Sequence, residues 1–373
     1  MRIPLVLLLW TVFCVQALAQ RPVFQYRYIR LEGEIGKQPV VLTLHELIRP
    51  YADLDNSTTS LPYFFGSYSY DRYQEPIKLH GYRDTSGMIV LEESIGWEIL
   101  GSMRLDETWQ GVWADSSGKR ALPIALRESY PEGSVAFKAG VRSDSFRLNP
   151  EAEESPMASL SLFWLTPSGA LRRTQDFLNN IFLRKIVGDD IFASGCCPDF
   201  DKAFERLRDS LSEEYRDEMA QIEPTDTDMP QGAYNYESES QIQILFNQNH
   251  ILSVGYFTYV YMGGAHGMYA IESVAYDLTT MRPLTLGDVF SGGYESDLEA
   301  ALQRAARRRA GLKPNESLEG HYLVPSIPIT NNFYLTGKGA VFGYPPYEIA
   351  PYAAGQIELF VPFSEMKRFL IRK

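Results

Sequence analysis

The stretch ILSVGYFTYVYMGGAHG, residues 251–267, joins a strongly β-forming segment to a glycine-rich loop. Tyr, Val and Phe dominate residues 251–261, and aromatic and β-branched side chains favour strands. Three glycines then surround His266. Glycine permits positive φ and close backbone approach, so this loop can bend sharply and leave several amide N–H groups facing outward as donors. The same residues also fit a tight turn with a hydrogen-bonded structural histidine, and both interpretations stay open.

Amphipathic helices are predicted on both sides of this strand. Apolar residues recur three and four apart over 171–182 and over 200–215, and this spacing places them on one face of a helix. A further helix is predicted over 294–310 and a further strand over 241–246. Residues 158–373 are therefore predicted to form an α+β domain, an antiparallel sheet with packed helices.

The N-terminal part of the chain has a different pattern, with short alternating strands and no long helix. Ile29 and Leu31 alternate with Arg30 and Glu32, so one face of this strand is predicted to be buried and the other wet. Further strands are predicted over 40–45, 68–70, 77–79, 89–92 and 122–126. We expect residues 20–148 to form an all-β antiparallel meander or barrel-like domain, curled or closed so as to limit its free edges.

Charged residues and two prolines interrupt the apolar pattern in NPEAEESP, residues 149–156. Such a stretch is typical of a connection between structural units. We therefore place a linker at 149–157, between the all-β domain and the α+β domain.

The first nineteen residues are predicted to be a cleavable signal peptide. Arg2 precedes a short apolar core, and Ala17-Leu18-Ala19 has the small-x-small pattern of a signal peptidase site. The apolar run is shorter than the roughly 18 to 20 residues that a membrane anchor needs, and no later segment reaches that length. A lipid anchor at Cys14 is a minor alternative, because the bulky Phe13 precedes it. We expect a periplasmic or extracellular protein without a membrane span, starting at Gln20.

Charge and cysteine content narrow the partners and the redox chemistry. The net charge of -12 argues against nucleic acid and anionic membranes, whereas a basic partner is electrostatically easier. Beyond the signal peptide only Cys196 and Cys197 remain, and as neighbours they cannot join distant parts of the chain. They either form a vicinal disulfide or stay as thiols, and we favour the thiols.

Common catalytic and cofactor motifs are missing from the sequence. There is no Gly-x-Ser-x-Gly elbow, P-loop, His-Glu-x-x-His or EF-hand loop, and the five histidines are far apart. We therefore predict no catalytic residues, no metal and no cofactor. A cell-wall hydrolase with Glu92, Glu93, Asp277 or Glu348 as acid and base remains an alternative.

The Gly-Gly-Ala-His-Gly core resembles the hallmark of the RsiV-like C-terminal domain family, whose function is largely unknown. Two later passages agree with that family in order, PLTLGDVF at 283–290 and YEIAPYAAG at 347–355. The resemblance covers about residue 158 to the C terminus. Met262 stands where a threonine is usual in the family, and Met281 takes the place of a turn glycine.

The resemblance implies an exported α+β unit that binds a ligand. One member of the family is a membrane-tethered anti-sigma factor that senses lysozyme, and similar domains occur with PdaC-like modules, joined to a peptidoglycan deacetylase. On this sequence, the ligand-facing residues that the resemblance implies are Tyr261, Gly263, Gly264, Ala265, His266 and Gly267, with Tyr347, Glu348 and Tyr352 in support.

We therefore predict an exported, non-catalytic binding protein that presents this loop to a protein ligand or to the cell envelope. A lysozyme-like enzyme is a plausible protein ligand, and peptidoglycan or another glycan is a plausible envelope ligand. One alternative is a glycan-binding cell-envelope module, with Trp109 and Trp113 as candidate stacking platforms, although buried rings fit these tryptophans better. The other is a cell-wall hydrolase or a deacetylase-associated protein.

Overall fold

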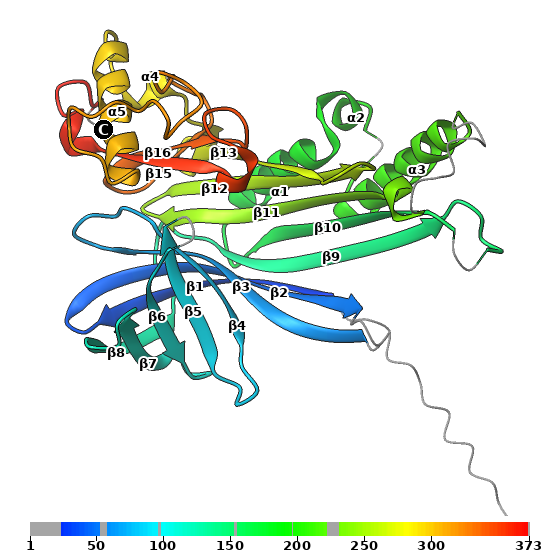
Figure 1. Ribbon diagram of the computed structural model, residues 1–373, viewed down its shortest axis with the longest axis horizontal. Helices are drawn as coiled ribbons and strands as arrows, with labels where there is room; N and C mark the ends of the chain where they lie inside the picture. Colours follow the sequence, from blue (N-terminus) through cyan, green and yellow to red (C-terminus); the bar gives the residue numbers. More distant parts are fainter. Residues whose placement is uncertain are drawn as a thin grey trace, which may run out of the picture.

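The computed structural model describes residues 24–52, 58–95, 98–152, 155–195, 197–221 and 231–371. An N-terminal barrel packs against a C-terminal α+β region, as Figure 1 shows in blue and in green to red. The predicted signal peptide and its cleavage site lie outside the described residues. Within the described ranges, no helix is long and apolar enough to cross a membrane.

The N-terminal strands form a closed antiparallel barrel, which confirms the all-β prediction. The strands are β1 (Gln25–Ile35), β2 (Gln38–Ala52), β3 (Thr58–Tyr70), β4 (Ile77–Arg83), β5 (Ile89–Ile95), β6 (Glu98–Leu105), β7 (Gln110–Asp115) and β8 (Ala121–Glu128). The last strand pairs with the first, with Leu31 opposite Glu128, so neither is left as an open edge. Alternate side chains, such as Ile29 and Leu31 on β1, fill the barrel interior. Strands β6 and β7 had no counterpart in the sequence prediction.

The C-terminal region is built on a central sheet with the strand order β14-β13-β12-β11-β10-β9. Its strands are β9 (Ala136–Arg147), β10 (Met157–Ser168), β11 (Tyr236–Gln248), β12 (Ile251–Met262), β13 (Met268–Asp277) and β14 (Arg282–Pro283). β10 and β11 run parallel, and the other pairs are antiparallel. Parallel neighbours need a long crossover, which here contains helices. The α+β prediction is confirmed, and the sheet departs from the predicted antiparallel one in this pair.

The segment predicted to be a linker is a hairpin connection within the central sheet. β9 falls in the segment 20–148 that the sequence assigned to the all-β domain, yet it pairs with β10 along its whole length. At the turn, the Leu148 N–H donates to Pro156 O at 2.9 Å. The barrel therefore gives way to the central sheet between β8 and β9, upstream of 149–157. Charges and prolines mark a long hairpin turn as readily as a domain boundary.

Three helices connect β10 to β11 on the side of the central sheet away from the barrel (Figure 1). They are α1 (Arg172–Val187), α2 (Asp189–Ala193) and α3 (Phe200–Met219). Leu178 and Phe182 of α1 are buried, so the predicted apolar face packs inward. Cys197, before α3, is buried and disulfide-bonded, so the thiol form that we favoured is wrong; Cys196 lies outside the described residues.

The last part of the chain forms a further layer against β12 and β13 (Figure 1). It contains α4 (Leu286–Val289), α5 (Glu295–Arg309) and a small sheet of β15 (Phe333–Leu335), β16 (Gly339–Tyr344) and β17 (Ile357–Pro362). Short 3-10 turns lie at Gln231–Tyr234, Tyr352–Ala354 and Phe363–Glu365. Ser253 Oγ donates to Leu335 O at 2.7 Å and accepts from the Leu335 N–H at 3.1 Å, which joins this layer to β12.

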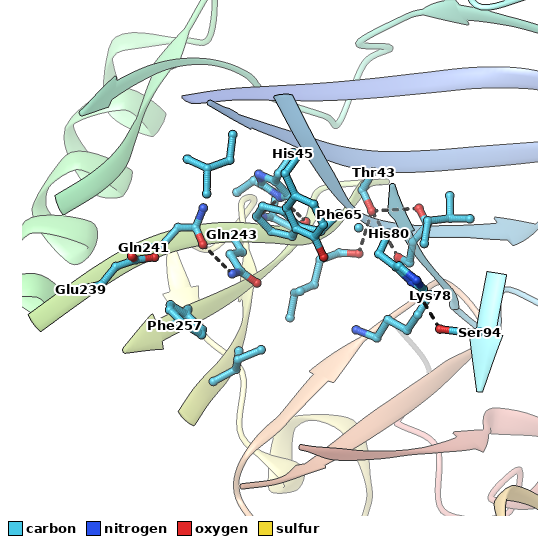
Figure 2. A pocket seen from close by; sticks show the side chains of 18 of the residues that line it. Thr43, His45, Phe65, Lys78, His80, Ser94, Glu239, Gln241, Gln243 and Phe257 are labelled. Atoms are coloured by element: carbon cyan, nitrogen blue, oxygen red, sulfur yellow. Dashed lines mark hydrogen bonds between the residues drawn. The ribbon is translucent and has the colours of Figure 1, made fainter. Parts of the chain in front are cut away.

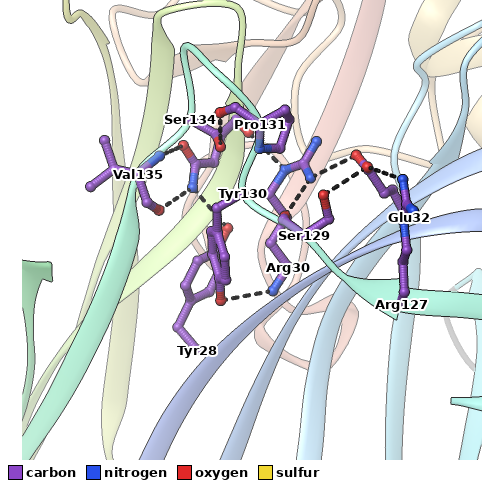
Figure 3. Close-up of polar contacts among 10 residues, drawn as sticks. Tyr28, Arg30, Glu32, Arg127, Ser129, Tyr130, Pro131, Ser134 and Val135 are labelled. Atoms are coloured by element: carbon purple, nitrogen blue, oxygen red, sulfur yellow. Dashed lines mark hydrogen bonds and ion pairs between the residues drawn. The ribbon is translucent and has the colours of Figure 1, made fainter. Parts of the chain in front are cut away.

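A buried arginine joins the barrel to the central sheet (Figure 3). The Arg30 guanidinium donates to Asn247 O at 3.0 Å, to Ser129 O at 2.7 Å and to the Glu32 carboxylate at 3.0 Å. Asn247 in turn donates to Tyr28 OH at 3.1 Å. The prediction that the outer face of β1 is wet is wrong at Arg30, which is 0 % exposed, because the C-terminal region covers that face.

Candidate functional site

The glycine-rich loop connects β12 to β13, and side chains hold it at both ends. Tyr261 OH donates to Gly264 O at 2.9 Å, and Tyr352 OH donates to Gly267 O at 2.9 Å. His266 Nδ1 lies 2.9 Å from Gly267 O, so a proton on Nδ1 is donated to that carbonyl. In the neutral ring with this tautomer, Nε2 is left as an acceptor.

Two of the loop glycines are required by the local geometry. Gly263 has a φ of 82°, and a Cβ there would lie 2.5 Å from Ala233 O. Gly267 is buried, and a Cβ there would lie 2.4 Å from the Tyr259 ring. These are the sharp bend and the close backbone approach for which the sequence has glycine.

The tip of the loop carries hydrogen-bond donors that have no partner among the described residues. Gly264, Ala265 and His266 are exposed. None of their amide N–H groups donates to another atom of the described chain. Successive free amides in a turn form a concave surface that attracts acceptor oxygens. The exposed tip of the loop therefore offers donors that an acceptor oxygen could reach.

Aromatic side chains gather on one side of the loop. The His266 ring stacks on Tyr352 with centroids 4.5 Å apart, and Tyr347 lies 5.7 Å from Tyr352. Tyr347 is 51 % exposed. The structure thus brings Tyr347 and Tyr352 to the predicted loop. The side chain of Glu348 makes no hydrogen bond or ion pair with the loop within the described residues.

A cavity of about 840 Å³ adjoins this aromatic cluster. Tyr352 lines it on one side, and Arg309 and His321 line it as well. Arg308 pairs with Glu365 at 3.1 Å, whereas Arg309 makes no ion pair with another described residue. The cavity therefore offers a half-buried cation beside the rings.

The carboxylates suggested for catalysis lie on separate elements or, for Glu92 and Glu93, on opposite faces of one strand. Glu93 is buried in the barrel, whereas its neighbour Glu92 points to the other face of β5 and lies 3.5 Å from His80. Asp277 closes the turn after β13. Glu348 is exposed in the last layer. Within the described ranges, no group of His, Cys, Asp and Glu side chains is arranged to hold a metal ion.

A second cavity, of about 810 Å³, lies between the barrel and the central sheet, and sequence reasoning missed it (Figure 2). Outward side chains of β2, β3 and β4 form one wall, and β11, β12 and β13 form the other. The available signal was the alternation of Glu239, Gln241 and Gln243 along β11, which places these side chains on one face. Such alternation is also typical of a strand with a solvated face, so it did not point to a cavity.

His45 lies at the back of this cleft as a neutral imidazole. Tyr26 OH donates to Ile242 O at 2.6 Å, so its oxygen accepts from His45 Nδ1 at 2.8 Å. His45 Nε2 then accepts the Ile244 N–H at 3.0 Å. Burial lowers the pKa of His45 to about 4. Because β10 pairs with β11 only as far as Gln241, these bonds supply the partners that the next residues of β11 lack.

A buried carboxylate, Glu239, and a half-exposed arginine, Arg49, lie together at one end of the cleft. Burial raises the pKa of Glu239, and the charge of Arg49 opposes this rise. The two side chains form an ion pair between β11 and β2. This pair links the barrel to the sheet at the rim of the cleft.

Two family models match parts of the C-terminal region. The model described as a protein of unknown function (DUF3298) matches residues 287–364, and the model described as deacetylase PdaC matches residues 171–269. No curated protein matches the chain. These matches relate the chain to DUF3298 and PdaC-like domains, but they do not identify the RsiV-like family that the sequence suggested.

Two solved structures are similar to the chain. A member of the DUF3298 family from Bacteroides fragilis is 25 % identical, with a TM-score of 0.57, over 64 % of this chain and 94 % of that chain. A DUF3298 family protein from Pseudomonas aeruginosa is 17 % identical, with a TM-score of 0.44, over 64 % of this chain and 96 % of that chain. The predicted loop lies in the PdaC-like segment, whereas Tyr347 and Tyr352 lie in the DUF3298-like segment. The surface around His266 is therefore formed where a PdaC-like and a DUF3298-like segment meet.

Proposed function

We propose that this chain is an exported, non-catalytic binding protein that holds a protein or cell-envelope ligand on the surface around the 263–267 loop. One observation carries the proposal: the exposed His266 ring stacks on Tyr352 beside an open cavity and three amide groups that have no partner within the described chain. His45, by contrast, is buried and held by hydrogen bonds on both ring nitrogens. Exposed rings and donors on a bent loop instead favour recognition.

The surface favours a ligand that combines acceptor oxygens with apolar groups. Its rings offer flat apolar faces, while the loop amides and Arg309 offer donors. Backbone carbonyls of a protein fit this description, and so do the acetamido groups of peptidoglycan. At long range the net charge of -12 favours a basic protein. A lysozyme-like enzyme, which the RsiV-like resemblance implies, is therefore the first candidate.

Binding of egg-white lysozyme to the immobilised protein tests the proposal. We expect His266→Ala and Tyr352→Ala to weaken binding by about tenfold or more, since truncation of a central aromatic contact costs more than 1 kcal/mol. Tyr82→Ala is the matched control, because Tyr82 is a 50 % exposed tyrosine on barrel strand β4. If lysozyme does not bind, purified peptidoglycan sacculi are the second probe. Binding to neither would contradict the proposal.

A further inference from the structure

Stacked rings form a shelf on the barrel wall of the cleft. Phe65 stacks on His45 with centroids 5.1 Å apart and planes 16° apart, and Tyr63 stacks on Phe65 at 6.0 Å and 22°. Hydrogen bonds to Tyr26 and Ile244 fix His45 at the inner end. Tyr63 is 46 % exposed and ends the row at the solvent. The row is thus a rigid apolar surface for a flat ligand.

On the opposite wall, the side-chain amides of Gln241 and Gln243 can form further hydrogen bonds (Figure 2). Gln243 Nε2 donates to Gln241 Oε1 at 2.9 Å. Within the described chain, Gln241 Nε2 is buried with no partner at hydrogen-bond distance, although the Gln241 side chain lies close enough to the Tyr26 hydroxyl to oppose the rise in its pKa, and Gln243 Oε1 accepts no hydrogen bond. A buried donor left without a partner costs about 1–3 kcal/mol, so it marks a place where a partner is missing. Gln241 Nε2 is therefore a donor, and Gln243 Oε1 an acceptor, that a ligand could use.

The cations that line the cleft are already neutralised. Arg49 forms an ion pair with Glu239, and Lys78 donates to Glu358 at 2.8 Å. A charged ligand would have to compete with one of these pairs. An uncharged ligand leaves both pairs intact, and it is therefore the better fit.

We infer that this cleft binds an uncharged, N-acetylated oligosaccharide. The volume of about 810 Å³ is in the range of small-molecule sites. A sugar ring lies against Tyr63 and Phe65, while its acetamido N–H donates to Gln243 Oε1 and its acetamido carbonyl accepts from Gln241 Nε2. That nitrogen is shielded from water in the empty cleft, so the last bond includes a rotation of the Gln241 side chain. The inference concerns a different site from the 263–267 loop and does not rest on the proposed function.

Titration calorimetry with chitotetraose, an uncharged N-acetylated tetrasaccharide, tests the inference. We expect the wild-type protein to bind it. Cellotetraose has a hydroxyl where chitotetraose has the acetamido group, so we expect it to bind about tenfold more weakly or worse. Failure of chitotetraose to bind, or equal affinity for both sugars, would overturn the inference.

Variants of the two walls locate the site. Tyr63→Ala removes the exposed end of the ring row and should weaken chitotetraose binding about tenfold. Gln243→Leu removes the acceptor and should weaken chitotetraose about fivefold, with little effect on cellotetraose. Tyr73→Ala, at a 59 % exposed tyrosine outside the cleft, should change neither affinity.

Three outcomes distinguish a sugar site in this cleft from the alternatives. His266→Ala should leave chitotetraose affinity unchanged, so failure at the loop and failure in the cleft are distinguishable. Unchanged affinity in both Tyr63→Ala and Gln243→Leu would overturn the inference. So would displacement of chitotetraose by 1-dodecanol, which would assign the cleft to an acyl chain. Because Tyr63 is half-exposed, Tyr63→Ala keeps the test informative even if a change at the buried Gln243 reduces stability.

Discussion

The neutral state of His45 gives the junction between the barrel and the sheet a defined pH dependence. Burial lowers the pKa of this imidazole in the folded protein from 6.5 to about 4. Between these two values the unfolded chain binds a proton that the folded protein does not. The free energy of unfolding therefore keeps its full His45 contribution above about pH 6.5 and loses it as the pH falls toward about 4.

The structure also explains why the proton is excluded. Burial strips water from the ring and disfavours the imidazolium, and this effect outweighs the hydrogen bond that a proton on Nε2 could donate to Ile244 O, 3.1 Å away. The difference between 6.5 and about 4 corresponds to about 3 kcal/mol when fully expressed. About 2 kcal/mol of it is lost between pH near 8 and pH near 5.

Urea unfolding at these two pH values, for wild type and His45→Gln, measures this contribution. Most other titrating groups are common to both proteins, so the stability difference between them isolates His45. We expect that difference to shrink by about 2 kcal/mol at the lower pH. Thr43→Val is the matched control, because Thr43 is buried on the same strand at the same junction and does not titrate. A wild-type to His45→Gln difference that is the same at both pH values would refute the reasoning.

Other predictions follow from single contacts. Intact-mass analysis of the protein recovered after export should give a chain that starts at Gln20. Gly267→Ala puts a Cβ 2.4 Å from the Tyr259 ring and should lower the free energy of unfolding by about 2 kcal/mol, measured by urea unfolding. Arg30→Met leaves buried acceptors without a donor and should cost about 3 kcal/mol in the same assay. Tyr269 touches rings of both candidate surfaces, so Tyr269→Leu should weaken lysozyme and chitotetraose binding together, in contrast to His266→Ala and Tyr63→Ala.

Local periodicity was enough for most of the elements. The apolar spacing over 171–182 and 200–215 corresponds to α1 and α3, and that over 294–310 to α5. Alternation along the N-terminal strands identified the side chains that fill the barrel. Periodicity reports which residues share a face, and a helix or strand with one apolar face must bury it.

Periodicity could not say what covers the other face. Arg30 and His45 alternate with apolar residues as solvated side chains do, yet both are buried. Their partners on β11 come far later in the chain, since His45 and Ile244 are 199 positions apart. The same separation in sequence hid the cleft, whose walls come from β2, β3 and β4 on one side and from β11, β12 and β13 on the other.

The loop illustrates the opposite case, in which local sequence was informative but incomplete. The glycines predicted a sharp bend and a close backbone approach. The bend occurs at Gly263, and the Gly267 backbone lies close to the Tyr259 ring. The ring that packs on His266 comes from Tyr352, in a separate segment, and no local pattern links the two. Only the resemblance to a family placed that segment beside the loop before the structure did.

The two candidate surfaces share one hairpin. Phe257 on β12 lines the cleft and stacks on Tyr269 of β13 with centroids 6.0 Å apart. The Tyr269 ring packs edge-on against the Tyr352 ring, with centroids 6.0 Å apart, and the His266 ring stacks on Tyr352. A continuous row of rings therefore runs from the cleft to the loop through β12 and β13. Tyr269 is therefore the ring that touches both candidate surfaces, whereas Tyr63 and His266 each belong to one of them, and this is why the effect expected of Tyr269→Leu differs from the effects expected of Tyr63→Ala and His266→Ala.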